Sequence, residues 1–191
     1  MKIMKHKQVP VSTTILFADI RGYTDLSQQI ESAQMNDLLH RFYDRCCSSV
    51  WEKDGIVNKF IGDAVLAIFN FPLIREQHVQ NAVEAALQLQ RECRNLKEEI
   101  GLSDAQTLGV GIGIHTGECQ IGEVGTTYKD FTAIGPVVNL TSRLQGAAGI
   151  GEVIITQEVF DQVRDRFPGA QQRSLTLKGI DNPVTAYALV P

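Results

Sequence analysis

The stretch Thr14-Ile15-Leu16-Phe17-Ala18-Asp19-Ile20-Arg21-Gly22-Tyr23-Thr24 decides the fold, because an apolar run ends in a carboxylate and passes directly into a glycine turn. A second run, 56–61, is followed at once by Gly62 and Asp63. Magnesium prefers oxygen ligands and usually takes one or two carboxylates together with substrate phosphates. If neighbouring strands deliver Asp19 and Asp63 beside this turn, the two carboxylates form a site for divalent cations that carry a nucleotide.

Spacing alone leaves a second interpretation of the two aspartates open. Asp19 can cap the helix that follows it, and Asp63 can shape a turn, since aspartate is common in both places. Further motifs are needed to decide between a metal site and two structural aspartates.

The composition describes one ordinary globular domain. The chain has 191 residues, of which 43% are hydrophobic and 21% charged, which suits a single domain. We assign residues 12–191 to that domain and residues 1–11 to a lead-in. No run reaches the ~20 apolar residues that cross a membrane, and the basic start lacks the apolar core of a signal peptide. We therefore expect no membrane span and a cytoplasmic location.

Charge and cysteine content exclude other classes. The net charge of −4 argues against a nucleic-acid partner, because such domains usually carry a basic excess. The four cysteines form no CxxC pair, so we expect reduced structural thiols.

Hydrophobic periodicity and turn residues predict an α+β fold. A helix is expected to follow the first strand, with Thr24 as its N-cap and Trp51 near its end. Gly62 and Asp63 form the tip of a β-hairpin. The alternating glycines of 109–113 predict a strand that another element approaches closely. The expected elements are strand 12–20, helix 24–51, strands 56–61 and 64–70, helix 76–100, strand 108–116, a hairpin over 117–135, helix 137–147, strand 153–155, helix 158–163, and strands 174–177 and 185–190. The order β-α-β-β-α-β indicates a ferredoxin-like βαββαβ core with helices on one face and additional C-terminal strands and helices.

Three blocks of the sequence resemble the catalytic domain of class III adenylyl cyclases. They are Phe17-Ala18-Asp19-Ile20-Arg21-Gly22-Tyr23-Thr24, then Lys59-Phe60-Ile61-Gly62-Asp63, and then residues 131–144, which read FTAIGPVVNLTSRL. They occur in the family's order, and the resemblance extends over 12–190. Each block alone is a weak signal, but the three together are specific to this class of nucleotidyl cyclase.

The resemblance implies two Mg²⁺ (or Mn²⁺) ions bound by Asp19, Asp63 and the backbone carbonyl of Ile20. One ion would lower the pKa of the ribose 3′-hydroxyl, and the other would hold the triphosphate. The hydroxyl would attack the α-phosphorus of ATP, giving 3′,5′-cyclic AMP and pyrophosphate. The turn with Gly22, Tyr23 and Thr24 would offer backbone N–H groups to the phosphates.

The other family positions concern the base, the ribose and the transition state. Lys59 matches the position that reads adenine N1, an acceptor, where guanylyl cyclases carry glutamate. Thr132 matches the second base-reading position, and its hydroxyl can accept from the adenine amino group. The resemblance assigns Asn139 to the ribose and Arg143 to the charge that develops at the α-phosphate. Lys178 matches a lysine used on the terminal phosphates.

Two positions depart from the family pattern. Many bacterial members carry an arginine where this chain has Tyr128, and Lys129 offers a cation one position later. Pro136 replaces a frequent aspartate, and proline is tolerated in the first turn of a helix. Neither change removes an expected ligand.

In the family, metal aspartates come from one protomer and base-reading and transition-state residues from the other. This chain carries both sets, which predicts a head-to-tail homodimer with two ATP sites. The short, basic start suggests an excised catalytic domain or a small stand-alone one. By analogy with relatives, we expect an upstream sensor domain as a partner. Family members with threonine at the position of Thr132 are often stimulated by bicarbonate, which suggests bicarbonate as an effector.

Three alternatives are weighed against an adenylyl cyclase. A guanylyl cyclase is disfavoured by Lys59. A diguanylate cyclase is disfavoured by the hairpin sequence 61–65, IGDAV, which is not a GGDEF signature. A catalytically silent regulatory module usually loses site residues, whereas this chain keeps Asp19, Asp63, Asn139 and Arg143.

Overall fold

The central strand β1 (Val9–Arg21) organises the molecule, since both of its edges are paired. The structure is a computed structural model that describes residues 9–190. On one side β1 pairs antiparallel with β3, and on the other it pairs antiparallel with β4. The sheet order is β2-β3-β1-β4-β6-β8-β7, with β5 paired to β4. The first four strands in this order form the expected ferredoxin-like core.

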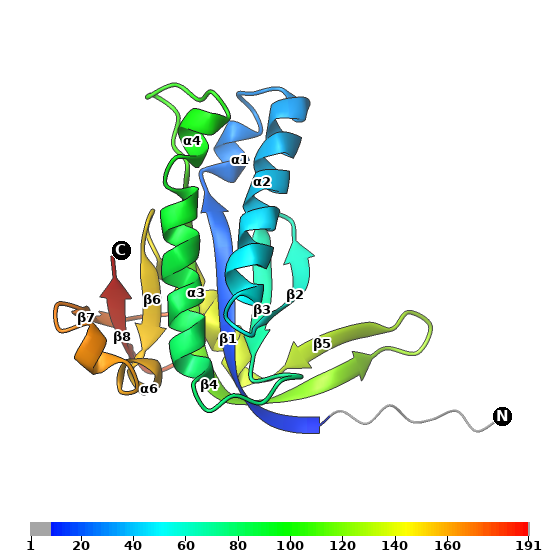
Figure 1. Cartoon of the computed structure of the whole chain (residues 1–191), viewed down its shortest axis with the longest axis vertical. Coiled ribbons are helices and arrows are strands. Elements are labelled where there is room, and N and C mark those ends of the chain that lie inside the picture. Colours follow the sequence, from blue (N-terminus) through cyan, green and yellow to red (C-terminus); the bar gives the residue numbers. More distant parts are fainter. Residues whose placement is uncertain (1–8, 191) are drawn as a thin grey trace.

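The remaining elements follow in chain order (Figure 1). They are α1 (Tyr23–Leu26), α2 (Ser32–Trp51), β2 (Ile56–Ile61), β3 (Ala64–Phe69), α3 (His78–Cys93), α4 (Leu96–Glu99), β4 (Gly109–Val124), β5 (Asp130–Ile134), α5 (Pro136–Ala147), β6 (Val153–Thr156), α6 (Gln157–Phe160), a 3-10 turn (Arg164–Arg166), β7 (Gln171–Leu175) and β8 (Val184–Leu189).

Alternation along β1 divides the core into two layers. Leu16 and Ala18 lie in a cluster with residues of α2 and α3, whereas Ile15 and Phe17 pack with residues of β3, β4, β5 and α5. Successive strand side chains point to opposite faces, so α2 and α3 share one face, as expected for the βαββαβ core. The expectation that helices cover only one face is wrong, because α5 packs on the other.

The glycines of β4 explain how close α5 comes to the sheet. A Cβ at Gly113 would lie 2.3 Å from the backbone nitrogen of Gln145, and one at Gly111 would lie 2.6 Å from the Arg21 guanidinium. At Gly113 the contact is with backbone, so no side chain larger than hydrogen fits, whereas at Gly111 a Cβ would displace the arginine. The predicted close approach to the glycine face is therefore confirmed: α5 approaches at Gly113, and the Arg21 side chain approaches at Gly111.

Strand β4 is longer than predicted. It runs to Val124 instead of ending at Thr116, and it pairs with β5 from Gln120 to Val124. The two strands form an arm that projects from the sheet (Figure 1). Gly117 does not stop the strand, because β1 pairs with β4 on both sides of it and supplies the hydrogen bonds that a short strand would lack.

The first predicted long helix is interrupted. Residues 24–51 form α1 and α2 instead of one helix, and Thr24 lies inside α1, whose N-cap is Gly22. The hydroxyl of Ser27 donates to the Thr24 carbonyl at 2.6 Å, a bond of the kind that competes with helix propagation. Glu31 is extended, with ψ 149°, immediately before α2 begins.

Other boundaries differ more modestly. The helix expected over 76–100 separates into α3 and α4 and ends before Gly101, whose φ is 73°. The helix expected over 158–163 is replaced by α6 and the 3-10 turn, and β7 begins three residues before the predicted strand at Ser174. All four cysteines are free, as predicted. Within residues 9–190, no helix combines the length and the apolar character needed to cross a membrane.

Candidate functional site

Strand pairing brings Asp19 and Asp63 to the same end of the sheet. Asp19 lies opposite Ala64 in the β1–β3 register, and the backbone N–H of Ile20 donates to the carbonyl of Asp63 at 3.2 Å. The hydroxyl of Tyr43, on α2, donates to the Gly62 carbonyl. The Tyr43 ring also stacks on Phe60, with ring centroids 4.1 Å apart. The hairpin tip that carries Asp63 is thus fixed to both β1 and α2.

An open pocket of about 410 Å³ lies at this end of the sheet. The residues that line it are Asp19, Ile20, Arg21, Gly22, Tyr23, Thr24, Asp25 and Asp63. The structure therefore brings together all of the predicted metal positions and the predicted phosphate turn. Gly22 has a φ of 85°, and a Cβ there would lie 2.2 Å from the carbonyl oxygen of Thr107, so the turn requires glycine.

The two carboxylates in this pocket repel each other. The pKa of Asp19 is raised from 3.8 to about 6, first by burial and second by the charge of Asp63, while Arg21 acts in the opposite direction. The Arg21 guanidinium lies 3.3 Å from the Asp19 carboxylate. It also donates to the carbonyl of Ala148 at 3.0 Å and to that of Gln145. Arg21 contacts Asp19 only, so the two carboxylates together keep an excess of negative charge.

This donor set fits a hard divalent cation. Two aspartates with an excess of negative charge provide the oxygen ligands that Mg²⁺ and Mn²⁺ prefer. Within residues 9–190, no group of three or more histidine, cysteine, aspartate or glutamate side chains is placed to hold a metal. The remaining ligands would therefore have to be carbonyl, water or substrate oxygens, as is usual for Mg²⁺.

The predicted base-reading residues lie together on a second part of the molecule. Lys59 forms an ion pair with Asp130 at the start of β5. A register shift between Val57 and Lys59 marks a bulge at Asn58. Asn58 donates to the Phe131 carbonyl at 2.9 Å and accepts from the Thr132 hydroxyl at 3.4 Å. Lys59 on β2 and Thr132 on β5, the two residues that the resemblance assigns to the base, therefore both take part in the contacts that join these strands.

Three further predicted residues are exposed. Asn139 and Arg143 lie on α5, and Lys178 lies after β7 next to Gly179, whose φ is 78°. Within residues 9–190 their side chains make no hydrogen bond or ion pair. None of them lines the aspartate pocket, and neither Lys59 nor Thr132 does. The structure of one chain therefore separates the predicted residues into two sets.

Sequence reasoning missed three residues of this region. It gave no role to Arg21, although this residue lies inside the first family block. It also gave no role to Asn58, which precedes Lys59, or to Asp130, which precedes the third block. Lys129, the expected substitute cation, forms an ion pair with Glu123 at 3.2 Å across the arm. Pro136 occupies the first position of α5, as predicted.

Comparison with known proteins agrees with this geometry. The sequence pattern of the family described as "Adenylate and Guanylate cyclase catalytic domain" matches residues 5–191. The chain belongs to this family. An adenylate cyclase of Anabaena cylindrica is 35% identical over 91% of the chain, and a terminal-differentiation specific adenylate cyclase of Dictyostelium discoideum is 32% identical over 94%. The chain spans only 36% and 9% of these two relatives, respectively.

Solved cyclase domains share the fold over nearly the whole chain. The adenylyl cyclase CyaB from P. aeruginosa is similar with a TM-score of 0.88 and 29% identity, over 97% of this chain and 96% of that one. The guanylyl cyclase Cya2 is similar with a TM-score of 0.85 and 26% identity, over 95% and 92%. Both specificities thus occur among structural neighbours of this nucleotidyl cyclase domain.

The repulsion between the aspartates predicts a pH-dependent stability of the metal-free domain. Because the fold raises the pKa of Asp19 from 3.8 to about 6, this residue lowers the free energy of unfolding as pH rises across that interval. An Asp19→Asn variant carries no ionisable group at this position, so its free energy of unfolding does not decrease in this way. It should be more stable than wild type by about 1 kcal/mol at neutral pH, a value reduced for solvent screening of the partly exposed carboxyl group. The advantage should vanish in acid. Urea unfolding with a chelator present, at a series of pH values, measures it, and a pH-independent difference would contradict the assignment.

Proposed function

We propose that this domain is an adenylyl cyclase that converts ATP to 3′,5′-cyclic AMP and pyrophosphate. The observation that supports the proposal is the junction of β2 with β5, where Lys59 pairs with Asp130 and Thr132 donates to Asn58, the residue before Lys59. It joins the strands that carry the two residues expected to read adenine. The aspartate pocket supports the proposal as well, because Asp19 and Asp63 line it together with the turn at residues 20–24. The named adenylate cyclase relatives point the same way.

The chemistry follows from what each side chain can do. When bound, two Mg²⁺ or Mn²⁺ ions neutralise the triphosphate and lower the pKa of the ribose 3′-hydroxyl. Asp19 and Asp63 would hold them, and the backbone of residues 20–24 would face the phosphates. Lys59 would donate to adenine N1, and Thr132 would accept from the adenine amino group. Arg143 would stabilise the charge on the α-phosphate as the 3′-oxygen attacks and pyrophosphate leaves.

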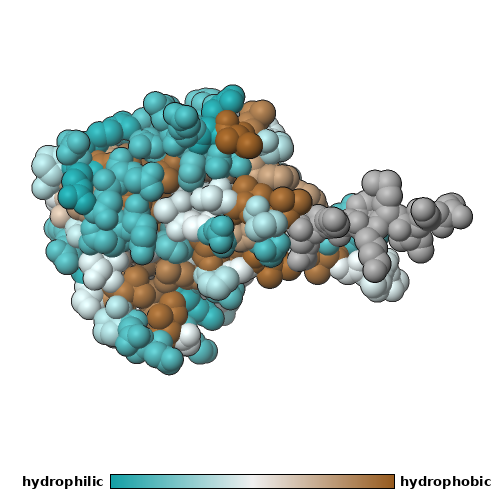
Figure 2. All heavy atoms as spheres, turned by 90° about the horizontal axis from the view of Figure 1, so that it is seen from below, coloured by the Kyte–Doolittle hydropathy of each residue, from teal (hydrophilic) through white to brown (hydrophobic). Residues whose placement is uncertain are grey.

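We propose that each site is shared between two copies of the chain, arranged head to tail. In support, the aspartate pocket contains none of the residues assigned to the base or the transition state, and Arg143 and Lys178 are exposed without a partner among residues 9–190. Exposed large apolar residues flank the base-reading pair: Phe60, Ile61, Phe131 and Ile134. Figure 2 shows hydrophobic surface on the side from which the β4–β5 arm extends. Such a surface is typical of an interface.

Guanylyl cyclase activity is the second candidate, because Cya2 and other guanylyl cyclases are among the similar proteins. Guanine presents a donor at N1, which a lysine ammonium cannot satisfy, so Lys59 favours ATP. A silent module is the third candidate. It is opposed by the intact set of site residues, and the activity assay below decides between all three.

Control by an upstream sensor domain is proposed from the length of the relatives, which extend well beyond the region matched here. A bicarbonate response is proposed only from Thr132. Activity that stays unchanged across a bicarbonate titration at fixed pH would reject it.

The activity itself is tested with purified protein, Mn²⁺ or Mg²⁺, and either ATP or GTP. We expect cyclic AMP from ATP, with far less product from GTP. An Asp63→Ala variant should lose at least about a hundredfold in rate, since a metal ligand is removed. Equal product from both proteins would refute the metal assignment, and preference for GTP would establish the second candidate.

The shared site predicts rescue between two inactive variants. Asp63→Ala and Arg143→Ala chains should each be inactive, but an equimolar mixture should regain about a quarter of wild-type activity. Half of the dimers would be mixed, and each would hold one intact site of two. The measurement is cyclic AMP formation after mixing. If the mixture stays inactive although mixed dimers are detected, the residues do not act across an interface.

We further propose that Asp130 positions Lys59. An Asp130→Asn variant should raise the KM for ATP about fivefold and weaken discrimination against GTP, with a smaller change in kcat, since an ion pair of this exposure is worth about 1 kcal/mol. Asp130→Glu keeps the charge and should restore most of the affinity. A lowered KM for Asp130→Asn would show instead that Asp130 competes with adenine for the ammonium group.

A further inference from the structure

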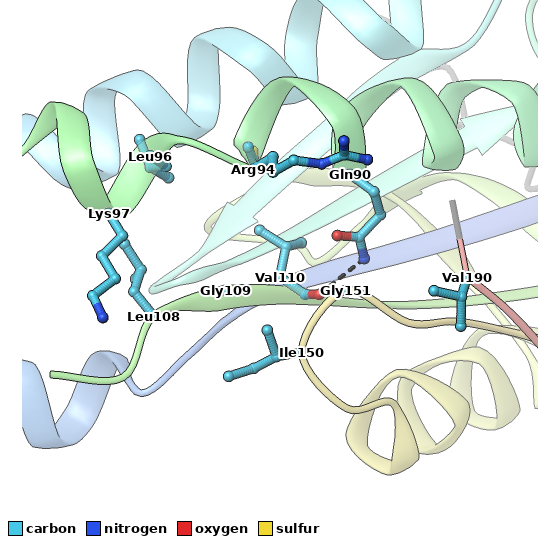
Figure 3. Close-up of a pocket in the computed structure, with 11 residues that line it drawn as sticks. Gln90, Arg94, Leu96, Lys97, Leu108, Gly109, Val110, Ile150, Gly151 and Val190 are labelled. Atoms are coloured by element: carbon cyan, nitrogen blue, oxygen red, sulfur yellow. Dashed lines mark hydrogen bonds between the residues drawn. The ribbon is translucent and has the colours of Figure 1, made fainter. Parts of the chain in front are cut away.

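A second cavity, of about 450 Å³, lies apart from the aspartate pocket and shares no lining residue with it. It is enclosed by the end of α3, the start of α4, the beginning of β4 and the loop at 150–151 (Figure 3). Nothing in the proposed cyclase reaction uses it. The residues that line it indicate the kind of ligand that it could bind.

One wall of the cavity is apolar. Leu108 and Val110 come from β4 and its approach, and Ile150 faces them from the opposite loop (Figure 3). Ile150 is 52% exposed, so its side chain is available for contact with a ligand in the cavity. Burial of such a wall would supply the main part of the binding free energy.

The other wall is cationic. Arg94 and Lys97 line the cavity from the α3–α4 junction. In the described part of the chain neither forms an ion pair, and Lys97 only donates to the carbonyl of Asp104 at 3.3 Å. Cys93 also lines the cavity, but burial raises the pKa of its thiol to about 12, so it adds no negative charge. The wall is therefore suited to an anion.

A buried amide lies between the two walls. Gln90 is only 6% exposed, and its Nε2 donates to the carbonyl of Val110 at 2.9 Å and to that of Glu152 at 3.1 Å. Its Oε1 accepts no hydrogen bond from any residue of 9–190. Gln90 lines the cavity, and this oxygen is not among the buried polar atoms that lack a partner, so it is accessible from the cavity. A ligand N–H or O–H group in the cavity would donate to it.

We propose that this cavity binds a small amphipathic organic anion. The ligand has an apolar body that covers Ile150 and Val110, a carboxylate or sulfonate that contacts Arg94 and Lys97, and one N–H or O–H group that donates to Gln90 Oε1. The occupant touches the loop after Ala148, whose carbonyl holds Arg21 next to Asp19. It would thus lie one loop away from the aspartate pocket.

The proposal is tested by binding, so its outcome does not depend on cyclase activity. The probe is anilinonaphthalene sulfonate, which combines an aromatic body, a sulfonate and one N–H group, and whose fluorescence rises in an apolar site. Arg94→Glu and Lys97→Glu should each weaken binding about tenfold, because attraction becomes repulsion. Arg91→Glu makes the same charge change at an exposed position of α3 outside the cavity and should leave binding unchanged.

An Ile150→Asp variant tests the apolar wall. It should weaken binding at least as much as the charge reversals, because it places a carboxylate against the apolar body. Thermal unfolding of each variant shows that the fold is kept. Absence of saturable binding to the wild type, or equal weakening by Arg91→Glu and Arg94→Glu, would overturn the proposal.

Discussion

The pairing of β1 with β3 is the constraint on which the rest of the site depends. It sets Asp19 opposite Ala64 and allows Ile20 to donate to the Asp63 carbonyl, so two carboxylates are held together although burial and mutual repulsion oppose it. Both strands contribute buried apolar side chains on both faces of the sheet. Packing of two layers therefore stabilises an arrangement that the carboxylates alone would not adopt.

Arg21 links this electrostatic arrangement to the opposite face. Its guanidinium lies beside Asp19 and is held by two carbonyls at the end of α5, and this is possible because Gly111 leaves room for it. The helix that carries Asn139 and Arg143 is thereby tied to the strand that carries Asp19. A movement of α5 would displace the Arg21 guanidinium and change the charge balance at the aspartates.

The parts of the fold that were predictable from sequence have strong local signals. The first strand, which carries Asp19, the hairpin with Gly62 at its tip and the helix with Pro136 in its first turn all depend on adjacent residues, and all three are present. The errors arise where distant partners decide. The extension of β4 beyond Gly117 depends on pairing with β1. The break after Leu26 is a local exception, since it coincides with a hydrogen bond from Ser27 to the Thr24 carbonyl three residues earlier. The position of α5 depends on glycines in another strand.

The candidate site shows the same division between local and distant information. Motifs identified Asp19, Asp63 and Lys59, whereas the partners of these residues emerged only from the three-dimensional contacts, as with Asp130 and Asn58. The contacts also separate the two sets of predicted residues within one chain. Lys59 is tied to β5 of its own chain, and the aspartate pocket opens without any base-reading residue on its walls. This separation is what the proposed head-to-tail dimer accounts for, because a second copy would bring Lys59 and Thr132 to the aspartates of the first.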